Sequence, residues 1–147
     1  IKEREWIKNS NQYVTLYERW DLFIPFIEKG LNLLHKDGVM SLIIKKSYNT
    51  AKYAEKSKKH IFDNHHFQQI DLFKNIKDLF DAAVENTIIT VKKTKSKQKT
   101  KRILHIDSFE NTIDLPATDN LKEMFAINPP MDLGKRLKNS ELLGNIC

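Results

Sequence analysis

Residues 20–53, WDLFIPFIEKGLNLLHKDGVMSLIIKKSYNTAKY, decide the fold expected for this chain. Apolar residues recur there at helical spacing, which predicts a helix with one wide apolar face. Gly38 ends this helical segment and turns the chain. Residues 39–44 are then a nearly continuous apolar run, as expected of a strand buried on both faces. The apolar helix positions are Leu22, Phe23, Phe26, Ile27, Leu31 and Leu34.

A polar loop follows this strand. Ligands of open α/β sheets bind at the carboxyl ends of the strands. The loop therefore supplies candidate substrate-binding residues for the rim of a pocket, namely Lys45, Lys46, Ser47 and Tyr48.

The rest of the chain predicts further alternation of helix and strand. Residues 51–64 indicate a polar surface helix, and residues 67–73, 86–91 and 102–106 indicate strands. The last two strands are expected to form a hairpin across the loop between them. Residues 119–125 favour a helix, whereas residues 1–20 are expected to be irregular before the first helix. Their aromatic residues are expected to pack on the sheet, with a nucleic-acid groove as the alternative: Trp6, Tyr13, Tyr17 and Trp20.

Composition limits the class of protein. A chain of 147 residues with 40% hydrophobic residues suits one folded domain. No apolar run approaches the roughly 18 residues that a membrane span needs. The single Cys147 excludes an internal disulfide and fits a cytoplasmic, reducing compartment. Both ends read as cuts from a longer protein.

The positive charge is concentrated in one segment. Residues 92–102, KKTKSKQKTKR, hold seven basic and no acidic residues, which exceeds the net charge of +6 of the whole chain. A solvated loop is the expected interpretation. Contacts of Lys93, Lys95 and Lys97 with DNA phosphates are the weaker alternative.

The residue identities in several motifs, and not only the pattern of polar and apolar positions, resemble one family. Asp21-Leu22-Phe23, Phe26 to Leu31, and Ser41-Leu42-Ile43 match conserved phrases of the adenine-specific DNA methyltransferases of type IIG restriction-modification enzymes, the TaqI-like gamma group. Gln69 to Phe73 and Leu79 to Ile89 match the strand-loop-strand that follows in that family. The resemblance runs from about Trp20 to Lys93.

The resemblance implies a chemistry. Such enzymes transfer a methyl group from S-adenosylmethionine to the amino group of an adenine flipped out of double-stranded DNA. Phe80 matches the aromatic residue that stacks on the flipped base, the alternative being that Phe80 fills the core at the end of a turn. The Gly-rich cofactor loop and the Asn-Pro-Pro-aromatic loop are expected upstream of Ile1. No cofactor-binding residue is therefore expected within this chain, which alone should be inactive.

The implied fold is the C-terminal half of a class I methyltransferase sheet, which is α/β. Strands 39–44 and 67–73 should run parallel, and strand 86–91 should be the reversed strand. Residues 1–107 would belong to the catalytic domain and residues 108–147 to a connector leading toward a target-recognition domain. The incomplete sheet would expose an edge that favours self-association. Two departures leave the shape of the base pocket open: Val39 replaces the second Gly of a Gly-Gly pair, and no Pro follows the strand.

Other motifs give weaker evidence about function. Asn128-Pro129-Pro130-Met131 lacks the aromatic fourth residue and the preceding strand of the catalytic loop, so a turn explains it. His60, His65 and His66 match no zinc spacing, and no metal site is expected. The sequence contains no Walker loop and no Gly-x-Ser-x-Gly turn. It also lacks the Glu-x-Lys and Asp-x-Lys tripeptides of the nuclease lobe. Two alternatives remain, a DNA-binding or assembly module that uses the basic loop and a degenerate methyltransferase remnant.

Overall fold

The protein is described by a computed structural model that covers residues 2–76 and 84–127. Phe80, the Asn128–Met131 segment and the predicted connector beyond it lie outside the described residues. The helices are α1 (Lys2–Asn9), α2 (Phe23–Leu33), α3 (Glu55–Asn64) and the short α4 (Leu121–Met124), with single 3₁₀ turns η1 (Lys46–Asn49) and η2 (Lys52–Ala54). The strands are β1 (Val39–Lys45), β2 (His66–Lys74), β3 (Asn86–Lys92), β4 (Thr100–Ile106) and β5 (Thr112–Thr118).

The five strands form one mixed sheet in the order β1-β3-β2-β4-β5. β3 pairs antiparallel with both β1 and β2, so β1 and β2 point in the same direction with the reversed strand between them. The predicted directions of these three strands are thereby confirmed. β2 and β4 pair in parallel, and β5 closes the described sheet antiparallel to β4.

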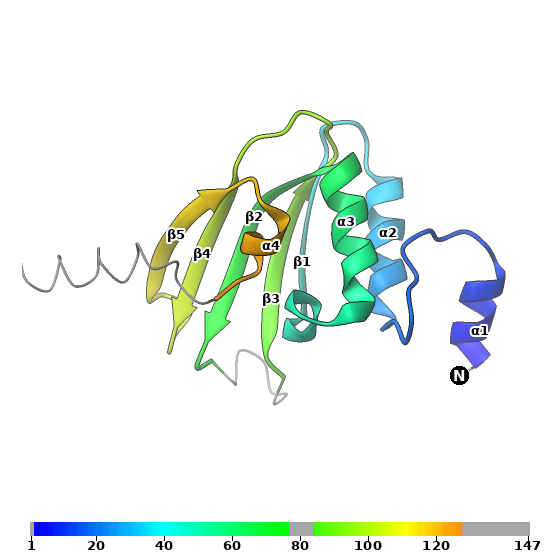
Figure 1. The fold of residues 1–147 in the computed structure, drawn as a ribbon, viewed down its shortest axis with the longest axis horizontal. Coiled ribbons are helices and arrows are strands. Elements are labelled where there is room, and N and C mark those ends of the chain that lie inside the picture. Colours follow the sequence, from blue (N-terminus) through cyan, green and yellow to red (C-terminus); the bar gives the residue numbers. More distant parts are fainter. Residues whose placement is uncertain (1, 77–83, 128–147) are drawn as a thin grey trace, which may run out of the picture.

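The predicted hairpin between the third and fourth strands is wrong. β2 lies between β3 and β4, and the basic loop crosses from one to the other beyond the start of β2, where His66 pairs with Lys92 (Figure 1). The β-branched face of β3 explains this arrangement, because Ile89 and Val91 are fully buried between two neighbouring strands that both come earlier in the chain. Residues 93–99, which connect β3 to β4, are enough to span the roughly 10 Å across one intervening strand.

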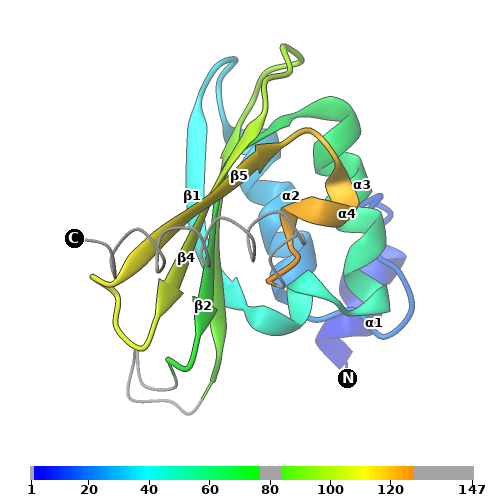
Figure 2. The ribbon, with the colours of Figure 1, turned by 60° about the vertical axis from the view of Figure 1, so that its left-hand side comes forward.

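The helices cover one face of the sheet. Figure 2 shows α2, α3 and α4 on the same side, with no helix of the described residues on the other. Side chains between the helices and the sheet form the core, which includes Ile24, Ile27, Leu31, Tyr48, Ile61, Phe67, Ile70, Leu72, Ile89 and Val91.

This one-sided cover corrects two expectations. Residues 39–44 were predicted to be buried on both faces, yet Val39 and Ile43 are 50% and 52% exposed because β1 is an edge strand of the described sheet and the described helices cover only its other face. The single apolar face predicted for α2 is also incomplete. Ile27 and Leu31 face the sheet, whereas Phe26 is 65% exposed on the outer side.

The segment before α2 contains a helix that the sequence did not predict. α1 has an exposed Trp6, and among the aromatic residues of this segment Trp20 is the one buried in the core. The buried carboxylate of Glu28 in α2 accepts hydrogen bonds from the backbone N–H groups of Val14 at 2.9 Å and Thr15 at 3.1 Å. Glu28, part of the matched family wording, therefore anchors the loop between α1 and α2.

The turn between α2 and β1 also differs from the prediction. Asp37, with φ of 64°, takes the left-handed conformation, whereas no positive φ occurs at Gly38. Gly38 is needed for space, because a Cβ there would lie 2.9 Å from the carbonyl oxygen of His35. The backbone N–H of Asp37 donates a hydrogen bond to the Lys93 carbonyl, and the N–H of Lys93 donates to the Gly38 carbonyl, both at 2.8 Å. This turn and the start of the basic loop therefore stabilise each other.

Residues past Asp107 contribute to the same sheet. β5 was not predicted, whereas α4 lies within the predicted helix 119–125. Leu115 and Met124 are buried in the common core. Where a catalytic domain ends and a connector begins stays a prediction, but the described residues show no structural break after Asp107. None of the described helices is long and apolar enough to cross a membrane.

Candidate functional site

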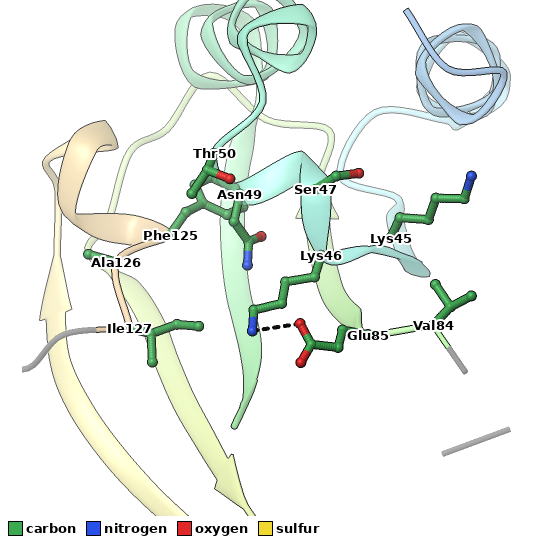
Figure 3. Close-up of a pocket in the computed structure, with 10 residues that line it drawn as sticks. All are labelled: Lys45, Lys46, Ser47, Asn49, Thr50, Val84, Glu85, Phe125, Ala126 and Ile127. Carbon is green, nitrogen blue, oxygen red and sulfur yellow. Dashed lines mark hydrogen bonds and ion pairs between the residues drawn. The ribbon is translucent and has the colours of Figure 1, made fainter. Parts of the chain in front are cut away.

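A cavity of about 760 Å³ opens where β1 ends and β3 begins. Three segments that are distant in the sequence form it: the η1 region after β1, the residues just before β3, and the residues after α4 (Figure 3). Its position at the carboxyl end of β1 is the position predicted from the sheet pattern. The lining residues are Lys45, Lys46, Ser47, Asn49, Thr50, Val84, Glu85, Phe125, Ala126 and Ile127.

An ion pair borders the cavity. The Lys46 ammonium lies 2.9 Å from the Glu85 carboxylate, and the backbone N–H of Lys46 donates to the Glu85 carbonyl at 2.9 Å. The two contacts join the end of β1 to the start of β3. Because both side chains are partly exposed, the pair contributes little to stability, and a ligand could separate its members at small cost.

Asn49 is held at the inner wall. Its side-chain carbonyl accepts a hydrogen bond from the hydroxyl of Thr87 in β3 at 3.0 Å, and its backbone carbonyl accepts from the ammonium of Lys58 in α3 at 3.0 Å. Burial lowers the pKa of Lys58, and nearby Glu55 opposes that effect. The Lys58 ammonium also lies 5.2 Å from the centre of the Phe125 ring. These contacts connect η1, β3 and α3 around one residue.

The third wall is apolar and comes from the residues after α4. The Phe125 ring packs edge-to-face against Tyr48 and Phe67, with centroids 5.7 and 5.5 Å away. The buried Arg102 guanidinium donates to the Met124 carbonyl at 3.1 Å and also to the carbonyl of Ala126. Arg102 thus fixes the path of the chain that brings Phe125 and Ile127 to the cavity.

The predicted rim residues have different positions. Lys46 points toward the cavity, whereas the Lys45 ammonium and the Ser47 hydroxyl point away from it in Figure 3. Lys45 pairs with Asp21 at 2.9 Å, and the Ser47 hydroxyl lies 2.8 Å from that of Tyr53.

Tyr48 needs a correction, because it is a core residue and not a rim residue. Its ring is fully buried against Phe23 and Phe125, and its hydroxyl lies 3.0 Å from that of Ser57. Burial raises the pKa of Tyr48, with the Ser57 hydrogen bond opposing. The 3₁₀ turn explains the difference from the expectation, since it rotates Tyr48 inward and presents Asn49 to the cavity.

The lysines considered for phosphate contact lie at the other end of the sheet. β1 is seven residues long, so its two ends are roughly 20 Å apart, and Val39 pairs with Lys92 at the far end. Lys93 donates to the Leu34 carbonyl at 2.8 Å, and Lys97 donates to the Phe62 carbonyl with its ammonium 4.3 Å above the Phe62 ring. Both therefore satisfy the carboxyl ends of helices α2 and α3. Lys95 is exposed.

Several cavity residues were not predicted from sequence. Asn49 follows the predicted rim by one position, and Glu85 precedes a predicted strand. Phe125 and Ile127 lie far away in sequence, and only the packing of α4 on the sheet brings them here. Within residues 2–76 and 84–127, no group of three or more His, Cys, Asp or Glu residues could hold a metal ion, and the His60 and His65 rings pack edge-to-face instead.

Comparison with known proteins now adds to this geometry. A model of the Eco57I restriction-modification methylase family matches residues 1–80, more than half of the chain. The chain belongs to this family. The matched residues include α2, β1, η1, α3 and β2, which carry the inner wall of the cavity.

A curated relative agrees with the family. The chain is 37% identical over 68 residues to the type II methyltransferase M.BstVI of Geobacillus stearothermophilus. The aligned part is 46% of this methylase-family chain but 12% of that relative. Family and relative together support a methyltransferase of the restriction-modification kind, and the chain corresponds to a small part of the relative's length.

Proposed function

We propose that this chain is part of a site-specific DNA methyltransferase that methylates the amino group of adenine. In this proposal the cavity at the end of β1 receives the flipped-out base, and Phe80 stacks on it. The parent protein acts in the cytoplasm on double-stranded DNA, and the 147 residues alone are inactive. The motifs quoted above resemble those of the TaqI-like gamma group.

The observation that carries the proposal is the position of the cavity within the family match. Its inner wall comes from residues that follow β1 and lie within the matched residues 1–80. A second wall, Val84 and Glu85, directly precedes β3, the reversed strand between β1 and β2. A reversed strand in this place is typical of class I methyltransferase sheets. Apolar walls from Phe125 and Ile127, with polar groups on one side, suit a flat heteroaromatic base.

The described residues do not fit the methyl donor. The carboxylate among the described residues that line the cavity belongs to Glu85, and it is already paired with Lys46. The glycines of the described residues, Gly30 and Gly38, serve helix packing and a turn. We therefore assign no residue of this chain to S-adenosylmethionine and derive no step through it.

The alternative of a DNA-binding module that uses the basic loop is weakened by two contacts. Lys93 and Lys97 already donate to helix carbonyls. Within the proposed function, contact of these lysines and of Lys95 with DNA phosphates stays secondary.

The test is base-modification sequencing of genomic DNA from a methylation-deficient bacterial host. The host carries either the whole coding region that surrounds these residues or residues 1–147 alone. N6-methyladenine at one short recurrent sequence, seen with the whole region and not with the chain alone, supports the proposal. Methylcytosine, or no modification by the whole region, would contradict it.

A further inference from the structure

Asn49 has a buried hydrogen-bond donor without a partner. The residue is 8% exposed, and its amide nitrogen Nδ2 has no hydrogen-bond partner among the described residues. The carbonyl oxygen of the same amide accepts from the Thr87 hydroxyl at 3.0 Å. A buried donor that lacks a partner destabilises a fold, so such a group calls for an explanation.

The amide is held in this orientation from two sides. Thr87, itself fully buried, binds the side-chain oxygen, and Lys58 binds the backbone oxygen at 3.0 Å. Asn49 also ends the η1 turn directly after the buried Tyr48, which limits backbone movement. The donor is therefore placed before any ligand arrives, which reduces the entropy lost on binding.

The donor faces the cavity. Asn49 lines it, and Figure 3 shows the amide nitrogen directed toward the space between Lys46 and Ile127. An amide nitrogen can only donate, so its partner in a ligand must be an acceptor. The nearby walls, Phe125 and Ile127, are apolar and suit a flat ring.

We propose that Asn49 Nδ2 donates a hydrogen bond to a ring nitrogen of the adenine that the cavity receives. This inference rests on the function proposed above and adds a specificity-determining residue to it. The exocyclic amino group of adenine is a donor and cannot satisfy Asn49, whereas the ring nitrogens are acceptors. The contact orients the base and leaves its amino group free for methylation.

The experiment measures binding of adenosine to residues 1–147 by NMR titration, beside 1-deaza-, 3-deaza- and 7-deazaadenosine. Each analogue replaces one ring nitrogen with C–H and so removes one acceptor. Asn49→Asp keeps an oxygen for Thr87 and removes the donor, and Asn49→Leu removes both. Asn64→Leu, at the exposed end of α3, is the matched control.

The expected result has two parts. Both Asn49 variants weaken adenosine binding by about threefold to tenfold, the effect of one lost hydrogen bond, and Asn64→Leu does not. One deaza analogue shows the same loss with the wild-type chain, and this analogue loses nothing further with the Asn49 variants, because the two changes remove the same contact. The analogue series on the wild-type chain decides the matter if the variants do not fold.

Two results would overturn the inference and are distinguishable. If the wild-type chain binds adenosine and all three analogues equally well, or if the Asn49 variants bind like wild type, the amide has a structural role and the base cavity stands. If the wild-type chain binds no adenosine at millimolar concentration, the assignment of the cavity in the proposed function fails together with the role of Asn49.

Discussion

At the scale of single residues, the motifs of this chain contain both residues that stabilise the fold and residues that line the cavity. Glu28 lies in the matched family phrase, yet its buried carboxylate binds the backbone of the preceding loop. Tyr48 lies in the predicted rim, yet it supports Phe125 from the core. Asn49, next to it, faces the cavity. One position along a 3₁₀ turn therefore separates a core residue from a candidate base-binding residue.

The two described glycines have opposite expected tolerance to alanine. At Gly38 a Cβ would lie 2.9 Å from a backbone oxygen that cannot move alone, so Gly38→Ala should destabilise the chain by about 1–3 kcal/mol. At Gly30 a Cβ would meet the flexible side chain of Met40 at 2.5 Å. There the gain in helix propensity of about 0.5–1 kcal/mol offsets the shift of Met40, so Gly30→Ala should be nearly neutral.

Urea unfolding of the two glycine variants beside wild type checks this pair. Each variant is the control for the other, since both add one methyl group. Equal stability of the two variants would show that the turn after α2 adapts to a Cβ and that our account of Gly38 is wrong.

At the scale of elements, the parallel pair β2 and β4 is joined by buried polar side chains on the sheet face that none of the described helices covers. The Asp71 carboxylate lies 3.0 Å from His105 Nε2 and also accepts from the Gln69 amide at 3.1 and 3.2 Å. His105 Nδ1 lies 2.7 Å from the Phe109 carbonyl oxygen. The rings of His105, Phe73 and Phe109 stack against one another, with the imidazole centroid 4.6 Å from Phe73 and 4.8 Å from Phe109. This cluster connects β2, β4 and the turn before β5.

Asp71→Asn is expected to destabilise the chain by roughly 2–4 kcal/mol, because an amide nitrogen replaces one of the two buried oxygens that contact Gln69 and His105. Asp114→Asn, on the exposed side of β5, is the control and should change the free energy of unfolding by less than about 0.5 kcal/mol. Urea unfolding measures both changes, provided that the dependence of the unfolding free energy on urea concentration is the same in the variants as in wild type. A loss at Asp71 no larger than at Asp114 would mean that the stacked rings hold this region without the carboxylate.

At the scale of the whole molecule, the junction between α3 and β2 makes stability depend on pH. Burial lowers the pKa of His65, with His60 and Lys93 adding to the effect, and burial lowers the pKa of His66, with Lys92 and Lys97 adding. Both residues are therefore neutral in the folded chain at pH values where the unfolded chain begins to bind protons.

The direction of the pH effect follows from linkage. Because the folded pKa values lie below the ordinary value of about 6.5, the stability from these residues is complete above that pH and is lost as the pH falls through the lowered values. We expect the midpoint of thermal unfolding to fall between about pH 7 and pH 5, and to fall less in a His65→Gln/His66→Gln double variant.

His35→Gln is the control for this pH profile, because His35 is exposed in the turn after α2. It should leave the pH dependence of the midpoint as in wild type. A double variant with the same profile as wild type would assign the acid sensitivity to other groups.

Local sequence patterns account for most helices and strands of this protein, although not for α1 or β5. The apolar period of α2 and the β-branched runs of β1 and β3 depend on local spacing, which the chain carries in itself. The family resemblance also indicated the reversed direction of β3, and the α/β sheet pattern indicated a cavity at the end of β1; both are present in the structure.

Tertiary structure alone decided which elements are neighbours and which side chains meet. β2 separates β3 from β4, although the loop between the latter two allows a hairpin, because the choice of partner depends on buried faces and not on loop length. Phe125 and Ile127 reach the cavity through packing of α4 and two hydrogen bonds from Arg102. Asn49 is distinguished because its buried amide nitrogen has no hydrogen-bond partner among the described residues. This property depends on the surroundings of Asn49 and cannot be read from a local sequence pattern.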